Sequence, residues 1–298
     1  MNNTTKAYKV FTFFNYIFMA LVIAVCLVPF LHTLAKALND GNDTMRGGIT
    51  IFPRAFTLEN FRILLSDTSL YRAAAVSVAV VICSVVSSLS VQFMAAYALS
   101  HADLPGRKKI MLFTIIPTFI SGGTIPTYIL FVKLGLLNNF LVYFLPGIYS
   151  FYNVMILRSY IEGSVPISLS EAAKLDGAGE LRVMLQIVFP LCKPVLATVA
   201  LWLAVGSWNN WSTALYYITN SDLHNLQYKL MEVIKESERL QALLQQAQMT
   251  GEVITAEVKT TPESLQCAQV IVTVLPIVCV YPFLQKYFVK GVTLGAVK

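Results

Sequence analysis

Six long apolar stretches dominate this sequence and limit what it can fold into. A helix needs about 20 mostly apolar residues to cross the hydrocarbon core of a bilayer. Four stretches and the later part of the fifth, residues 194–205, contain no Asp, Glu, Lys, Arg or His; the first contains only His32, and the fifth has Lys193 in its first part. In residue numbers the stretches are 10–34, 73–99, 110–131, 140–157, 187–205 and 265–284. The sequence therefore predicts an all-α integral membrane protein with six transmembrane helices.

Composition argues against a water-soluble enzyme. Hydrophobic residues make up 56% of the chain and charged residues only 13%, whereas about 25% is typical of soluble domains. The net charge of +6 does not indicate nucleic acid, because the largest basic cluster is Arg107-Lys108-Lys109. The five cysteines lack metal-ligand spacing and read as small buried hydrophobic residues, so no metal site is expected.

The distribution of charge predicts the orientation. Six spans place both termini, the loop 101–109 and the segment 158–193 on one side, which carries twelve Lys and Arg against five Asp and Glu. The other side carries ten against eleven, mostly in two longer loops. Basic residues in short loops mark the cytoplasmic side, so both termini are expected in the cytoplasm. The first stretch is too long for a signal peptide and lacks a small-residue cleavage site, which predicts a retained helix.

The uncharged span cores also bear on energy coupling. Ion-coupled carriers and proton pumps need ionisable residues at membrane depth, and an intramembrane enzyme needs catalytic groups there. The chain also lacks the phosphate-binding pattern GxxxxGK[ST]. If it transports a solute, another subunit is expected to bind ATP and supply the energy.

The segment between the fourth and fifth stretches, residues 161–194, is the most informative. Pro166 ends the preceding element, and Ser168 or Ser170 is expected to cap a short helix with Glu171 in its first turn. Gly177 is expected to end that helix in a left-handed conformation. A second amphipathic piece, 181–189, leads to Pro190. The pattern predicts a short rigid helix presented to a partner, with alanines that permit close approach.

This segment resembles the EAA loop of permeases from binding-protein-dependent ABC importers. The family pattern falls on Glu171, Ala172, Ala173, Asp176, Gly177, Ala178, Ile187, Pro190 and Pro194. The Asp-Gly-Ala extension and the second proline are similar to the maltose-type, carbohydrate-uptake branch. Two further stretches agree with that branch: Trp208-Asn209-Asn210-Trp211, and the tail 285–298, which in the family usually ends with one more glycine. The resemblance covers roughly residue 71 to the end.

The resemblance implies a type I ABC importer permease fold and a non-catalytic role. Residues 1–70 would form the first helix and external loop, 71–285 the transport domain, and 286–298 a cytoplasmic tail. The chain would form half of a permease dimer in a bacterial cytoplasmic membrane. Two cytoplasmic ATPase subunits holding Mg-ATP would grip the EAA helix, an external binding protein would deliver the solute, and no cofactor would bind the chain itself. Coupling to the ATPases would fall on Glu171, Ala172, Ala173, Asp176, Gly177, Ala178 and Pro190.

Sugar sites combine aromatic faces with amide and hydroxyl groups in a mostly apolar pocket. Candidates for a substrate path with these side chains are Tyr128, Trp208, Asn209, Trp211 and Tyr216. Aromatic residues near a membrane boundary are also typical interface anchors, so both readings stay open. Whether this subunit contacts the substrate stays open too, as does the identity of the sugar.

Three other features carry expectations. The outer loop 207–264 contains an amphipathic helix at 226–249, whose cover is its own bundle, the membrane surface or a partner. A small-residue face on the second stretch is expected to pack against a helix; it consists of Ser77, Ser84, Ser87, Ser88, Ala95 and Ala98. Gly122 and Gly123, with Pro117 and Pro126, break the third stretch. The alternatives to sugar import are a different solute, such as an amino acid, polyamine or phosphate, an ion-coupled carrier, or a membrane scaffold.

Overall fold

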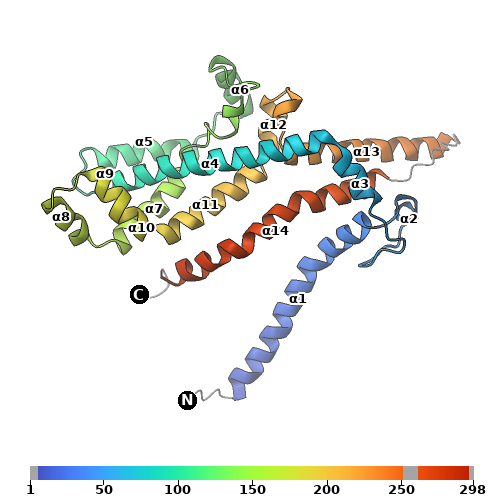
Figure 1. Cartoon of the computed structure of the whole chain (residues 1–298), viewed down its shortest axis with the longest axis horizontal. Coiled ribbons are helices and arrows are strands. Elements are labelled where there is room, and N and C mark those ends of the chain that lie inside the picture. Colours follow the sequence, from blue (N-terminus) through green and yellow to red (C-terminus); the bar gives the residue numbers. More distant parts are fainter. Residues whose placement is uncertain (1–5, 251–260, 295–298) are drawn as a thin grey trace. The chain divides into compact units, whose positions relative to one another are not determined.

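The computed structural model describes residues 6–250 and 261–294, and their regular structure is helical (Figure 1). In these two ranges, the one β feature is an isolated bridge between Asn39 and Phe56. The all-α class is therefore confirmed. The helices are α1 (Lys6–Ala37), α2 (Gly41–Met45), α3 (Glu59–Ser66), α4 (Thr68–Ser100), α5 (Arg107–Phe119), α6 (Thr124–Lys133), η1 (Phe140–Tyr143), α7 (Phe151–Ser164), α8 (Ile167–Leu175), α9 (Glu180–Val183), η2 (Met184–Val188), α10 (Phe189–Leu191), α11 (Lys193–Trp208), α12 (Ser212–Tyr217), η3 (Ser221–Leu223), α13 (Leu226–Thr250) and α14 (Pro262–Leu294).

Three helices of the described chain are long and apolar enough to cross a membrane. They are Tyr8–Ala37 within α1, Thr68–Ser100 (α4), and Pro262–Cys279 within α14. Two bent pairs also pass if each counts as one span: α5 with α6, bent by 117°, and Glu180–Leu191 with α11, bent by 83°. The described residues thus contain up to five spans by length and composition.

The expected fourth span, residues 140–157, is not one helix. The 3₁₀-helix η1 ends at Tyr143, turns containing Pro146 and Gly147 follow, and α7 begins at Phe151 with Ser150 as its N-cap. Proline cannot donate to a helical ladder and glycine weakens it, so the Pro-Gly pair interrupts the apolar run. Because α7 has only 14 residues, it is about 21 Å long. The number of six spans stays a prediction.

The break in the third apolar stretch is confirmed. Residues 120–123 separate α5 from α6, and Gly123 has a φ of +84°, a conformation that glycine adopts without the strain that a Cβ causes. Within the fifth stretch, Cys192 ends α10 in a non-helical conformation, and α11 begins at the next residue, Lys193.

The chain forms two compact units. The first contains Met1–Leu70 and Leu230–Leu275, and the second contains Tyr71–Lys229 and Pro276–Lys298. In the second unit, α4 buries one stripe spaced by three or four residues, as one helix face requires. The stripe consists of Ala73, Ser77, Val80, Ser84, Ser88, Gln92, Ala96 and Leu99. The expected packing of Ser77, Ser84 and Ser88 is therefore observed, whereas Ala98 is exposed.

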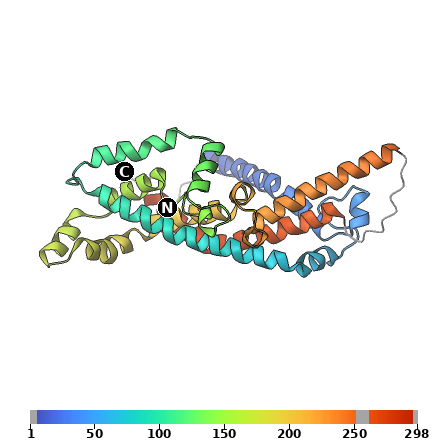
Figure 2. The same ribbon diagram turned by 90° about the horizontal axis from the view of Figure 1, so that it is seen from above.

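The second unit has two apolar clusters along α4. One joins α4 to α7, η2 and α11, with Leu157, Val188 and Val199 at its centre. The other joins α4 to α6 and α12 through Val80, Phe131 and Ala214. Figure 1 and Figure 2 show α8 and α9 near the C-terminal end of α4, and α6 and α12 further along it. The two clusters thus support the two candidate regions predicted from the sequence.

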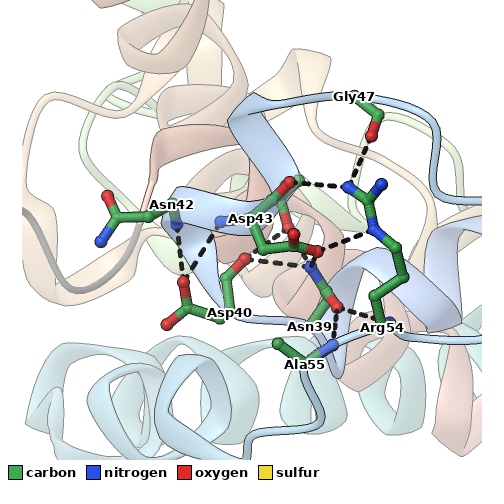
Figure 3. A network of polar contacts seen from close by, with 8 residues as sticks. Asn39, Asp40, Asn42, Asp43, Gly47, Arg54 and Ala55 are labelled. Atoms are coloured by element: carbon green, nitrogen blue, oxygen red, sulfur yellow. Dashed lines mark hydrogen bonds and ion pairs between the residues drawn. The ribbon is translucent and has the colours of Figure 1, made fainter.

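In the first unit, the loop after α1 is built around Asn39, which has no exposed surface (Figure 3). Its Oδ1 accepts hydrogen bonds from the backbone N–H groups of Arg54 and Ala55 at 2.9 and 2.8 Å. Its Nδ2 donates to Asp43 Oδ2 at 2.9 Å and to Thr44 Oγ1 at 3.1 Å. This amide therefore ties the end of α1 to α2 and to the loop segment at Arg54 and Ala55.

The same loop is fixed to the start of α14. The fully buried Asn60 donates from Nδ2 to the carbonyls of Ala37 and Asn39, and its Oδ1 accepts from Ser264 Oγ at 3.0 Å. Lys36 and Glu263 form an ion pair at 2.6 Å. The C-terminal end of α1 is thus held by polar contacts.

Candidate functional site

The predicted coupling helix is α8, which follows directly after Pro166. Pro166 has an extended conformation (φ −61°, ψ 129°), and the helix begins at the next residue without a side-chain cap. The expected caps Ser168 and Ser170 lie inside the helix, so that detail of the prediction is wrong. The fixed φ of Pro166 already directs the chain into the helix.

The C-terminal end of α8 is a Schellman motif. The N–H of Gly177 donates to the carbonyl of Lys174 at 3.0 Å, and the N–H of Ala178 donates to the carbonyl of Ala173 at 2.9 Å. Gly177 has a φ of +82°. These two bonds satisfy carbonyls that a helix end leaves without partners. The left-handed ending at Gly177 is therefore observed as expected.

The surface of α8 is open. The helix has no buried residue, and Glu171, Ala172, Asp176 and Gly177 are all exposed. Leu175 is 90% exposed. The exposed Leu175 gives this helix an apolar end next to its acidic residues. Removal of a leucine side chain from water lowers the free energy, so contact of this end with a partner is favourable.

Two alanines make the apolar contact between this segment and the rest of the unit. Ala173 and Ala178 are partly buried and pack against the first apolar cluster. Ala173 is at position C3 and Ala178 at position C″ of the Schellman motif, the pair that commonly makes its apolar contact. The alanines thus allow α8 to approach the bundle closely.

Glu180 is a site residue that the sequence did not reveal. Its Oε1 pairs with Lys174 Nζ of α8 at 2.5 Å. Its Oε2 accepts a hydrogen bond from Tyr97 Oη of α4 at 2.7 Å and lies 3.8 Å from His101 Nε2. The hydrogen bond from Lys174 is the main cause that lowers the pKa of Glu180, and the same bond raises the pKa of Lys174. No local sequence signal could have indicated a partner 83 positions away.

Pro190 lies in α10, after one π-helical segment. That segment, η2, buries Met184 and Val188 in the first cluster, while Pro190 itself is exposed. The chain then turns by 83° into α11. Pro190 therefore sits where the EAA segment turns into a span.

A second group of charges joins α5 to α7. Glu162 accepts from Arg107 Nη2 at 2.5 Å and from Arg158 Nε at 3.0 Å. Arg158 Nη1 also lies 3.1 Å from the sulfur of Met111. Arg158 and Glu162 lie four residues apart on one face of α7, whereas Arg107 belongs to α5.

Three of the five candidate substrate-path residues lie within α6, α11 and α12. Tyr128 of α6 and Tyr216 of α12 are exposed, and both rings neighbour Tyr217, at centroid distances of 6.2 and 6.1 Å. Trp208 is buried at the end of α11, with 8% exposure. The structure therefore brings Tyr128 and Tyr216 together around Tyr217.

The remaining two candidates lie at the junction of α11 and α12. Asn209 accepts a hydrogen bond from Gln227 Nε2 at 3.1 Å and caps α11, and Trp211 precedes α12 with 36% of its surface exposed. Asn138 holds the chain segment that follows α12. Its Oδ1 accepts from the backbone N–H groups of Thr219 and Asn220 at 2.6 and 3.0 Å.

The buried polar contact between α4 and α7 is made by uncharged amide side chains. Gln92 of α4 is fully buried, donates to the carbonyl of Ile148 at 3.1 Å, and accepts from Asn153 Nδ2 at 3.1 Å. These bonds satisfy both ends of an amide that would otherwise be costly to bury. Among the residues with described positions, no group of His, Cys, Asp or Glu could hold a metal ion.

Apolar spans, an uncharged bundle interior and a short exposed helix between two spans define an integral-membrane transport subunit. The family model for the inner membrane component of binding-protein-dependent transport systems matches residues 93–294. The chain belongs to that family, so the family resemblance inferred from the sequence is confirmed.

Relatives match along nearly the whole chain. It is 31% identical to the polygalacturonan/rhamnogalacturonan transport system permease protein YtcP of Bacillus subtilis (strain 168), over 97% of this chain and 99% of that one. It is 33% identical to the protein LplC of the same organism, over 99% and 97%.

A crystal structure of a bacterial ABC transporter involved in the import of the acidic polysaccharide alginate has the same fold. The TM-score is 0.82 at 24% identity, over 97% of this chain and all of the matched chain. The permease fold is therefore shown by structure as well as by sequence.

Proposed function

We propose that this chain is the translocation subunit of an ATP-driven importer for oligosaccharides. The observation that carries the proposal is α8, a helix with no buried residue, fixed at its end by a left-handed glycine and placed between two spans. An ATPase that closes on ATP would grip this helix through Glu171 and the exposed apolar end at Leu175. The chain itself would carry out no chemical step.

The geometry supports a mechanical route into the membrane. A rigid α8 passes a displacement to α9 through the turn at Gly177, and η2 and α10 continue into α11 across the 83° bend. Packed helices tend to change between discrete arrangements rather than to deform continuously. Closure of two ATPase subunits would thus rotate α11 and its partners, opening the path on the opposite side of the membrane.

The wider assembly is proposed from the family and from charge. A second permease subunit would complete the path, and an external binding protein would deliver the solute. The basic loop 101–109 supports a cytoplasmic location for α8 and for both termini. Residues 1–5 and 295–298 lie outside the described residues.

A carbohydrate substrate is supported by the names of the relatives and by the aromatic residues. Besides YtcP, these relatives include an arabinooligosaccharide and a maltodextrin permease protein. Tyr128, Tyr216 and Tyr217 supply stacked and exposed aromatic rings of the kind that bind sugar faces. An ion-coupled carrier is less well supported, because ionisable residues are missing from the span cores. A different solute is less well supported, because these relatives are named for carbohydrates.

The proposal is tested by purifying the tagged chain with its co-purifying subunits and reconstituting the complex in liposomes. ATP-dependent uptake is measured for labelled trigalacturonate, maltotriose, an amino acid and a polyamine. Glu171→Lys and Gly177→Pro should each lower uptake at least tenfold. Glu171 is exposed, so the charge reversal leaves the fold intact, whereas proline cannot adopt the φ of Gly177.

The matched control is Glu59→Lys, a charge reversal at the first residue of α3, far from α8 in the sequence. It should leave uptake within twofold of the original protein. Uptake that ignores both α8 variants would refute the coupling role, and uptake of the polyamine alone would refute a sugar substrate.

A further inference from the structure

The attachment of α8 to the rest of its unit is weak for an element that must transmit force. None of its residues is buried, and Ala173 is the α8 residue that packs against the apolar cluster. A single methyl group buries too little surface to fix the orientation of a helix. The chain connections at Pro166 and Gly177 hold the two ends, but they do not stop the helix from turning about its own axis.

A polar link opposes that rotation. Lys174 is the α8 residue whose side chain forms an ion pair, and its partner is Glu180 at the start of α9. The other carboxylate oxygen of Glu180 accepts the hydroxyl hydrogen of Tyr97, which is 7% exposed and belongs to the apolar cluster. One carboxylate therefore contacts the coupling helix and a membrane helix at once.

We infer that Glu180 is a positioning residue that connects α8 to α4, so that displacement of the coupling helix moves α4 together with α11. This inference rests on the proposed function of α8. Glu180 acts through Lys174 and Tyr97 and touches neither the ATPase nor the solute. Without the link, α8 follows the ATPase while α4 lags behind, and ATP is hydrolysed with less import.

The surrounding charges favour the linked arrangement. Lys174 also feels Asp103 and Glu171, and both acids favour its charged form. His101 Nδ1 lies 2.9 Å from the carbonyl of Tyr97. The ring of His101 is thereby placed beside the Glu180 carboxylate, with Nε2 3.8 Å from Oε2. The raised pKa of Lys174 and the lowered pKa of Glu180 indicate that both partners are charged near neutral pH.

The test uses the complete complex in liposomes, with the import of whichever probe the unmodified complex takes up, labelled trigalacturonate or maltotriose. The quantity is the number of ATP molecules hydrolysed per sugar imported. Glu180→Gln keeps an acceptor for Tyr97 but loses the charge that binds Lys174. The ratio should rise about fivefold, while the amount of co-purified ATPase stays the same. Glu263→Gln is the control, because it breaks a comparable ion pair with Lys36 in the other unit, and it should not change the ratio.

Exchange of the two charges separates a specific link from a general structural role. Lys174→Glu alone places two acids together and should raise the ratio, and adding Glu180→Lys should bring it back to within twofold of the original. A pair that fails to recover would overturn the inference. If Glu180→Gln does not assemble, Tyr97→Phe decides, because it removes one hydroxyl group: a raised ratio supports the link and an unchanged ratio overturns it. Absence of ATP-dependent import by the unmodified complex would instead refute the proposed function.

Discussion

Two polar centres of this molecule, one around Asn39 and one around Glu180, are built in opposite ways. Asn39, in the first unit, is an uncharged amide with no exposed surface, and its Oδ1 bonds to two backbone N–H groups. Glu180, in the second unit, is a charged group with 58% of its side chain exposed, and its partners are other side chains. Asn39 holds loop segments in place from a buried position, whereas Glu180 joins helices from a largely exposed position.

The difference teaches what each centre can do. Neutral hydrogen bonds from a buried amide to backbone groups are costly to break and nearly independent of salt, so they specify one conformation. An exposed ion pair contributes little to the free energy of unfolding and is screened by salt, but it forms and breaks readily. The first construction suits a fixed loop, and the second suits α8, the segment that we propose to move in each transport cycle.

The largest expected effect comes from removing the buried amide. Asn39→Ala leaves the N–H groups of Arg54 and Ala55 without their acceptor and should destabilise the protein by about 3 kcal/mol. The measurement is the thermal denaturation midpoint in detergent. Asn42→Ala is the matched control, because the Asn42 side chain is exposed and only its backbone N–H is bonded to Asp40 (Figure 3). Equal midpoints for the two variants would contradict the rigid role of Asn39.

The next effect concerns the C-terminal end of α8, the proposed coupling helix. Gly177→Ala should cost about 1–2 kcal/mol, because a Cβ is strained at a φ of +82° even though no atom lies within 4 Å of it. ATP-dependent import should fall by up to about tenfold, the change that 1.4 kcal/mol makes in an equilibrium. Gly163→Ala, in α7 and also without close neighbours, should leave import unchanged. A loss in both variants would locate the effect outside the left-handed turn.

A smaller effect should appear with pH. The pKa of Glu180 is lowered in the fold, so its stabilising contribution is full above the unfolded value of about 4.3 and is lost as the pH falls through the folded value. The difference in denaturation midpoint between the original protein and Glu180→Gln should therefore shrink as the pH falls from 7 to below 4. The difference corresponds to less than about 1 kcal/mol, since the group is largely exposed. A difference that grows in acid would contradict the assigned charge state.

The smallest effect tests whether an ion pair stabilises the loop after α1. Glu263→Gln breaks the pair with Lys36 and should cost about 0.5 kcal/mol, falling further in 1 M salt. Asn39→Ala should keep its full effect in the same salt. A salt dependence of equal size in the two variants would remove the contrast between the neutral and the charged centre.

Local sequence signals predicted the candidate site in part. Pro166 and Gly177 located the two ends of α8, because each residue type restricts or permits specific backbone angles. The same reasoning placed the break at Gly123. It misplaced the N-cap of α8, and it missed the interruption at Pro146 and Gly147, where a long apolar run outweighed the turn residues.

Partners distant in the chain were beyond such signals. Tyr97 was one of several aromatic residues near a span end, and Gln92 was one polar residue in an apolar stretch. Their contacts with Glu180 and Asn153 depend on which helices pack together, and hydropathy does not encode that choice.

By itself, the sequence determined the class of the protein and the position of α8, because uncharged apolar runs, proline and glycine act locally on solvation and on backbone angles. Only the tertiary structure decided that residues 230–275 join the first 70 in one unit, that Asn60 meets Ser264, and that one carboxylate links α8 to α4. These contacts follow from the packing of whole helix faces, in which each residue's partner depends on the entire surrounding surface.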